Sequence, residues 1–248
     1  MRLESVPPQV QTSHVCSDEP PAPELRRLDD DPMQRYWVSR PRLRHLQHGA
    51  PAGLLVSVHG ISRNAGAHAR ALASLADELG LVLVAPHFSR SRFPDYQRMG
   101  RPERLGPGGR ADHMLLRIVH AVRTEFGLPA QPFLLMGHSG GAQFTLRFAL
   151  AHAPHVAAYA LSAPGNYCWP DTARRFPHGA APNRSFPDLQ PSLAALLQRP
   201  GLVLVGASDV ERDDALRQGE RIDTQQGRTR FERAQRWVAA MHERAAEQ

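Results

Sequence analysis

The sequence of 248 residues predicts an α/β fold, in which a mostly parallel sheet carries helices on both faces. Two observations lead to this prediction. Short apolar runs alternate with longer stretches whose apolar residues recur at helical spacing, and a glycine-rich turn at residues 137–141 joins one run directly to such a stretch. The length fits one well-buried domain, which we place at residues 34–248.

The amino-terminal residues 1–33 are rich in proline and acidic side chains, a composition that buries too little apolar surface to order the chain. We expect a flexible tail there. Its first part has no uninterrupted apolar segment, so we expect neither a signal peptide nor a membrane anchor. Residues 36–46 are expected to form an early strand pair.

The remaining elements alternate regularly. They are strand 54–59, helix 65–79, strand 81–85, helix 112–126, strand 133–136, helix 141–152, strand 156–162, short helix 192–198, strand 201–205 and helix 228–246. Leu75 and Leu79 lie on the apolar face of the first helix and are expected to point inward. Residues 86–109 and 163–190 are expected to be irregular, the second forming a small cap or rim.

The formal net charge of +6 comes from arginine alone, because all thirty basic residues are arginine. They alternate with acidic residues and form no basic stripe with aromatic side chains, which argues against a nucleic-acid partner. Cys16 and Cys168 are too few and too far apart for a disulfide framework or a metal site. We therefore expect no metal, no cofactor, no membrane partner and a cytoplasmic location.

The turn at residues 137–141 reads Gly-His-Ser-Gly-Gly. A serine at the tip of a sharp turn from strand to helix is held in a strained backbone conformation with its hydroxyl exposed. Side chains two residues before and after the tip would collide, which explains Gly137 and Gly141. The following helix directs its positive end, with the amide of Gly140, at an oxygen beside Ser139. We predict that Ser139 is a nucleophile and that Gly140 forms half of an oxyanion hole.

Residues 59–62, His-Gly-Ile-Ser, follow the strand 54–59. Ligands of parallel sheets bind where the strands end, and Gly60 allows a close approach of the backbone. We predict the amide of Ile61, or alternatively that of Ser62, as the second oxyanion donor.

A catalytic carboxylate is expected after a later strand at the same edge of the sheet. The strand 201–205 leads into Asp209, which we predict to orient the catalytic base. Asp213 and Asp214 follow within a few residues and are the alternatives.

The turn at residues 137–141, the turn at residues 59–62 and Asp209 after a late strand place the nucleophile before the acid along the chain. In these features residues 50–246 resemble the α/β-hydrolase family. The segment Leu-Ser-Ala-Pro-Gly-Asn-Tyr at residues 161–167 is similar to one in bacterial esterases related to polyhydroxybutyrate depolymerases. The resemblance implies a serine hydrolase that cleaves a small-molecule carboxylic ester through an acyl-enzyme on Ser139.

The chain departs from this family in its histidines. The family places the catalytic histidine on a loop after a last strand, and neither has a counterpart here, where His242 is the only histidine after Asp209. Three explanations for the missing histidine remain open: the sequence is cut short, the protein is a hydrolase-like binding protein without turnover, or another histidine acts as the base. His87 is the best substitute, His138 should point away from Ser139, and His242 is expected on the helix surface.

A missing last strand leaves residues 201–205 at an open, apolar edge of the sheet, which favours pairing with a second copy as a homodimer. The arginines of residues 86–109 indicate either an anionic substrate or a solvated loop. The aromatic residues of 163–190 indicate either an apolar rim or ordinary packing.

Overall fold

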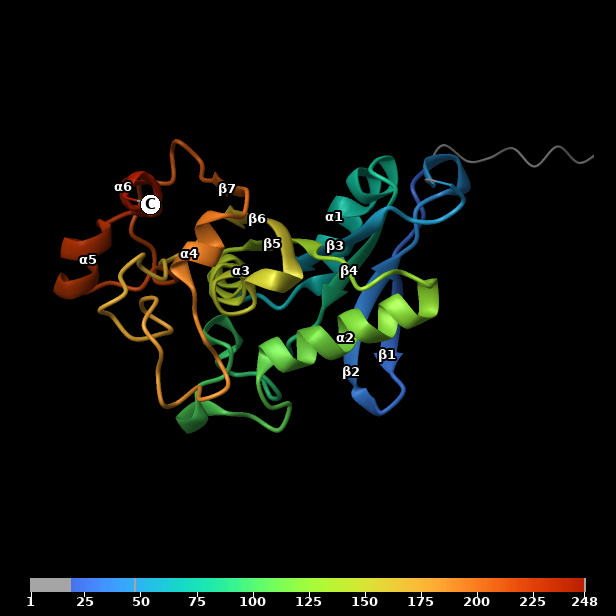
Figure 1. Ribbon diagram of the computed structural model, residues 1–248, viewed down its shortest axis with the longest axis horizontal. Helices are drawn as coiled ribbons and strands as arrows, with labels where there is room; N and C mark the ends of the chain where they lie inside the picture. The colour runs from blue at the N-terminus through green and yellow to red at the C-terminus, as the bar shows by residue number, and fades with distance from the viewer. Residues whose placement is uncertain (1–18, 47, 248) are drawn as a thin grey trace, which may run out of the picture.

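The computed structural model of the protein describes residues 19–46 and 48–247. Seven strands form one sheet in the order β1-β2-β4-β3-β5-β6-β7. They are β1 Glu24–Leu28, β2 Asp31–Ser39, β3 Gly53–Val58, β4 Leu81–Pro86, β5 Phe133–His138, β6 Val156–Ser162 and β7 Gly201–Leu204. The helices are α1 Ala65–Glu78, α2 Ala111–Phe126, α3 Gly140–Ala151, α4 Leu193–Leu197, α5 Glu220–Gln226 and α6 Arg230–Ala246. The pairs β1–β2 and β2–β4 are antiparallel and the other four pairs are parallel, which confirms the predicted fold class (Figure 1).

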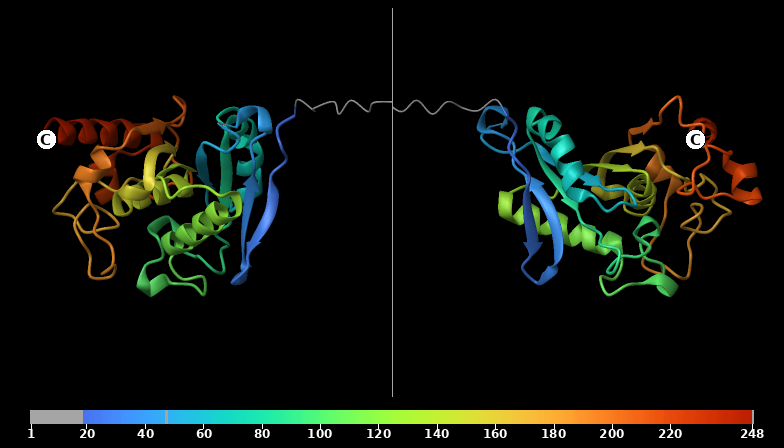
Figure 2. Two further views of the ribbon diagram at one scale, coloured as in Figure 1. Left: turned by 45° about the vertical axis from the view of Figure 1, so that its right-hand side comes forward. Right: turned by 180° about the vertical axis from the view of Figure 1, so that it is seen from behind.

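The hairpin β1–β2 shows that the prediction of a flexible tail is wrong for residues 24–33. The early strand pair was expected at residues 36–46, but it begins earlier and overlaps that range only at residues 36–39 of β2. Asp30 and Asp31 of the hairpin form ion pairs with arginines of α2 and of segment 86–109, so acidic residues that suggested disorder help to hold a strand pair. Residues 1–18 of the predicted tail lie outside the described residues. The hairpin stands at one end of the molecule and α6 at the other (Figures 1 and 2).

The central strands are buried because helices cover both faces of the sheet. In β3, Leu55 packs into the core beneath α1, whereas Val56 and Val58 pack into the larger core with α2 and α3. The strands β3 and β5 pair in parallel, and their carboxyl ends therefore lie side by side.

Helix α1 faces the sheet differently from the prediction. Ala69, Ala73 and Ala76 are buried, whereas Leu75 and Leu79 are about half exposed. A stripe of alanines lets the helix lie close to the strands, and the larger leucines then remain outside.

β7 is an edge strand, and no strand of the described residues pairs with its free side. Leu202 and Leu204 are 53% and 48% exposed, and the strand has no charged residue. The opposite edge strand, β1, carries charged residues that discourage pairing with another sheet. The two edges of the sheet therefore differ in their tendency to associate.

We expect the protein to associate through β7. Light scattering at increasing concentration should show dimers of the wild type, and Leu202→Lys should abolish them because it places a charge on the apolar edge. Leu25→Lys, on the charged edge β1, is the matched control and should leave association unchanged. A wild type that stays monomeric at high concentration would contradict this expectation.

Residues 163–190 contain no helix and only one isolated β-bridge. Their aromatic side chains Tyr167, Phe176 and Phe186 are buried, and Tyr167 stacks on Trp237 of α6 with a ring distance of 5.0 Å. Ordinary packing, not an open rim, explains these three residues. Among the helices of the described part of the chain, none is long and apolar enough to cross a membrane.

Candidate active site

Ser139 forms the tip of the turn between β5 and α3. Its φ of 52° and ψ of −112° lie outside the regions that residues with a side chain favour. The Ser139 N–H donates to the carbonyl of Ser162 at 2.7 Å, and the Ser139 carbonyl accepts from the N–H of Gln143 at 3.2 Å, which holds this conformation. Within residues 19–46 and 48–247, no side chain hydrogen-bonds to the Oγ of Ser139. The hydroxyl is therefore available to a ligand.

The glycines on either side make this turn possible. A Cβ on Gly137 would collide with the backbone of Gly141, and a Cβ on Gly141 would collide with the carbonyl of Val58. The start of α3 therefore packs backbone to backbone against the end of β3.

Residues 59–62 lie against the same turn. A Cβ on Gly60 would be 3.6 Å from the Cβ of Ser139, and one on Gly140 would be 2.9 Å from the Cγ2 of Ile61. The amide of Gly140 is the first of α3 and has no acceptor within that helix. The amide of Ile61 donates to no acceptor among the described residues. The structure thus brings Ser139 together with two backbone amides that lack acceptors.

His59, directly before this turn, is buried and uncharged. Its Nδ1 donates to the carbonyl of Gly60 at 2.8 Å, and its Nε2 accepts from the N–H of Phe88 at 3.0 Å. Burial lowers the pKa of His59 to about 4, and the charge of Arg63 adds to the effect. The neutral ring therefore fastens the turn to the segment after β4.

His59 should make stability depend on pH. Its pKa is about 4 in the folded protein and 6.5 in an unfolded chain, so the unfolded state binds more protons between these values. We expect the free energy of unfolding to fall by up to about 3 kcal/mol from this group between pH 7 and pH 4. Urea denaturation across this range should show a smaller fall for His59→Gln. Equal falls in the two proteins would contradict the role of His59.

Segment 86–109 packs onto the site from outside the sheet. The hydroxyl of Tyr96 donates to the carbonyl of His59 at 2.8 Å, and the guanidinium of Arg63 lies 4.2 Å from the Tyr96 ring centre. Arg92 pairs with Asp31, while Arg98 and Arg101 both pair with Asp95. Much of the positive charge that suggested an anionic substrate here is thus neutralised. Sequence reasoning missed these positioning roles because no motif marks them.

Arg147 of α3 is fully buried without a carboxylate partner. It donates to the carbonyls of Pro177, Gln97 and Gln143 at 2.8 to 3.2 Å, and to the Oδ1 of Asn166 at 3.1 Å. Burial lowers its pKa to about 10, so the side chain stays charged at neutral pH. Arg147 therefore joins the helix after Ser139 to both irregular segments.

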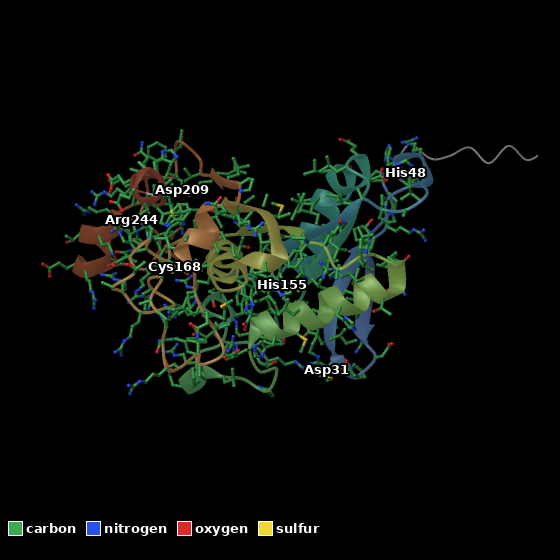
Figure 3. All side chains as sticks on the ribbon, viewed as in Figure 1. Asp31, His48, His155, Cys168, Asp209 and Arg244 are labelled. Atoms are coloured by element: carbon green, nitrogen blue, oxygen red, sulfur yellow. The ribbon has the colours of Figure 1, made fainter. Side chains whose placement is uncertain are left out.

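Two of the three candidate acids contact Arg230 at the start of α6 (Figure 3 labels Asp209). Asp209 accepts a hydrogen bond from Arg230 at 3.3 Å, and Asp213 pairs with the same arginine at 2.8 Å. Asp214 is exposed. Among the described residues, none of these carboxylates is hydrogen-bonded to a histidine.

Among the described residues, neither candidate base hydrogen-bonds to the side chain of Ser139. His87 lines a surface cavity with Trp37 and Asn64, and its ring centre lies 6.0 Å from that of His59. His242 is exposed on α6, as expected, and lines a cavity with Gly201 at the amino end of β7.

His138 precedes Ser139 but turns its Nδ1 toward the Oγ of Ser162, 3.1 Å away. Burial and the charge of Arg230 lower the pKa of His138, and Asp209 opposes them. The predicted direction of this ring, away from Ser139, agrees with that hydrogen bond.

The arrangement combines a partly buried serine hydroxyl that has no side-chain partner with two free amides, which suits nucleophilic attack on a carbonyl group. In the part of the chain that the structure describes, no three His, Cys, Asp or Glu side chains gather as metal ligands would.

This topology, with a strained serine after the central strand β5, defines an α/β-hydrolase fold. No family model and no curated protein matches the sequence. Among solved structures, poly(aspartic acid) hydrolase-1 from Sphingomonas sp. KT-1 is similar with a TM-score of 0.74 and 21% identity, over 92% of this chain and 88% of that one.

The poly(3-hydroxybutyrate) depolymerase LpqC from Bordetella parapertussis is similar with a TM-score of 0.70 and 24% identity, over 91% of this chain and 79% of that one. A thermostable esterase is similar with a TM-score of 0.56 and 13% identity, over 90% of this chain and 52% of that one. These similarities confirm the fold that the resemblance implied.

Proposed function

We propose that this protein is a serine hydrolase that cleaves carboxylic esters through an acyl-enzyme on Ser139. The observation that carries the proposal is the strained turn that presents the Ser139 hydroxyl beside the amides of Ile61 and Gly140. The similar structures include hydrolases and an esterase, and one of them is by name the depolymerase of a polyester, which supports an ester as the substrate.

In the proposed reaction, the Oγ of Ser139 attacks the ester carbonyl carbon and loses its proton to a water molecule. The carbonyl oxygen becomes an oxyanion, which the amides of Ile61 and Gly140 stabilise. The C–O bond to the alcohol breaks, and the alcohol leaves with a proton. Water then attacks the acyl group on Ser139, releases the acid and restores the hydroxyl.

A second candidate function is a hydrolase-like binding protein. It is favoured by Asp209, whose carboxylate is held by Arg230 where a hydrolase of this fold pairs its acid with a histidine. Such a protein would bind esters beside Ser139 without turning them over.

Hydrolysis of 4-nitrophenyl butyrate by the purified protein separates the two candidates. A rate well above that of buffer alone, which phenylmethylsulfonyl fluoride abolishes, would support the hydrolase. Product formed only at the rate of buffer, while butyrate esters still bind, would support the binding protein.

A further inference from the structure

A cavity of about 460 Å³ lies between the irregular segment 163–190 and the region of α5. We call it the arginine pocket. Its walls carry Arg174, Arg175 and His178 from the irregular segment and Arg217 and Arg221 from the later part of the chain. Helix α5 lies at one end of the molecule, with the irregular segment between it and α3 (Figure 1).

The positive charge of this pocket is not balanced. Glu220 is the one acidic residue in its walls, and Arg174 donates to the neutral amide of Gln225 at 2.5 Å. None of its four arginines forms an ion pair with a carboxylate of the described residues, unlike the arginines of segment 86–109. Cations that share a cavity repel one another, and an anion in the cavity would relieve this repulsion.

The surrounding groups show the same positive field. Burial lowers the pKa of His178 to about 4, and the charges of Arg147, Arg98, Arg217 and Arg101 lower it further, in that order. His178 is therefore neutral at pH 7, and the arginines supply the charge of the pocket.

Buried side chains hold the two walls together. The amide of Gln226 donates to the carbonyl of Tyr167 and accepts from its N–H, both at 2.9 Å. Arg233, fully buried, donates to the carbonyls of Gly165 and Arg217. The pocket is thus formed by fixed backbone, not by loosely attached loops.

The wall of the pocket is connected to the helix that follows the proposed nucleophile. Asn166 lines the pocket and donates to the Oε1 of Gln143 at 2.9 Å. Gln143 lies one helical turn after Ser139 on α3, which is about 5 Å along the helix axis. Ser139 does not itself line the pocket, and the hydrogen bond between Asn166 and Gln143 is what connects the pocket wall to the helix that begins after Ser139.

We propose that the arginine pocket binds an oxyanion group, a carboxylate or a phosphate, carried by the ester that Ser139 cleaves. This inference rests on the proposed function. Arginine forks bind such groups through two parallel hydrogen bonds, and four of them around one cavity select for negative charge. The substrate class is then an anionic ester, and the pocket sets the distance between the charge and the scissile bond.

The test compares two 4-nitrophenyl esters with the same six-carbon acyl chain. One is the mono-4-nitrophenyl ester of adipic acid, which carries a free carboxylate, and the other has that carboxylate converted to its neutral methyl ester. We expect the wild type to prefer the anionic ester, and the double variant Arg217→Gln/Arg221→Gln to lower kcat/KM for it at least tenfold. The methyl ester should change less than twofold, and Arg70→Gln, on α1, should change neither. No preference in the wild type, or equal losses for both esters, would overturn the proposal.

A binding measurement separates this proposal from the proposed hydrolysis. Calorimetric titration of Ser139→Ala with adipate and with inorganic phosphate needs no turnover. Binding of either anion that the double variant loses supports the pocket even without ester hydrolysis, and the tighter of the two identifies the oxyanion. Hydrolysis of neutral esters, with no binding of either anion, would overturn the pocket and leave the hydrolase standing.

Discussion

Replacing Ser139 with alanine should lower kcat/KM for 4-nitrophenyl butyrate about a hundredfold or more. Removing the nucleophile of a complete serine hydrolase lowers the rate about a millionfold. General-base catalysis accounts for up to about ten-thousandfold of such effects. No histidine of the described residues hydrogen-bonds to the Ser139 hydroxyl. Dividing the first factor by the second leaves about a hundredfold, which is the rate enhancement that we expect from attack by the Ser139 hydroxyl without a general base.

The matched control for this variant is Ser62→Ala. Ser62 is exposed in the neighbouring turn, and its hydroxyl donates to Asn64 at 2.9 Å, so its loss leaves the backbone amides in place. We expect Ser62→Ala to retain most of the activity. Equal rates for Ser139→Ala and the wild type would mean that any hydrolysis arises elsewhere on the protein.

Replacing Gly141 with alanine should destabilise the fold by about 3 kcal/mol or more. The added Cβ would collide with the carbonyl of Val58 and lie 2.5 Å from that of His59, and neither backbone group can rotate away. The turn carrying Ser139 and the turn carrying Ile61 would separate, so hydrolysis should fall together with stability. Urea denaturation measures the first effect and ester hydrolysis the second.

Gly206→Ala is the control for Gly141→Ala. A Cβ at Gly206 would meet nothing closer than 3.9 Å, so the same chemical change there should be close to neutral for stability. A Gly141→Ala protein as stable as the wild type would show that the close packing of α3 against β3 is not required.

The order of the central elements could be predicted because each strand is short, apolar and followed by helical periodicity. The strands of the parallel part and the turn at Ser139 lie where this pattern placed them. The pairing of β3 with β5 then explains why residues 59–62 and 137–141 meet, although about eighty positions separate them in the sequence.

Other features depend on contacts that no local pattern shows. The hairpin β1–β2 is stabilised by arginines far along the chain, so its own composition resembled a tail. Helix α1 buries alanines because the sheet lies close to it. Arg63, with a φ of 60°, and Tyr96 act on the site only through tertiary contacts. In segment 86–109, the pairing of Arg98 and Arg101 with Asp95 is local, whereas that of Arg92 with Asp31 depends on a tertiary contact that the segment's own sequence does not show.

The central claim is that Ser139 is the nucleophile, and mapping a covalent adduct tests it most directly. The protein is treated with a fluorophosphonate, its intact mass is measured, and the modified peptide is sequenced by mass spectrometry. We predict one phosphonyl group, attached to Ser139 and absent from the Ser139→Ala variant. An unmodified wild type, or an adduct on any other residue, would contradict the claim.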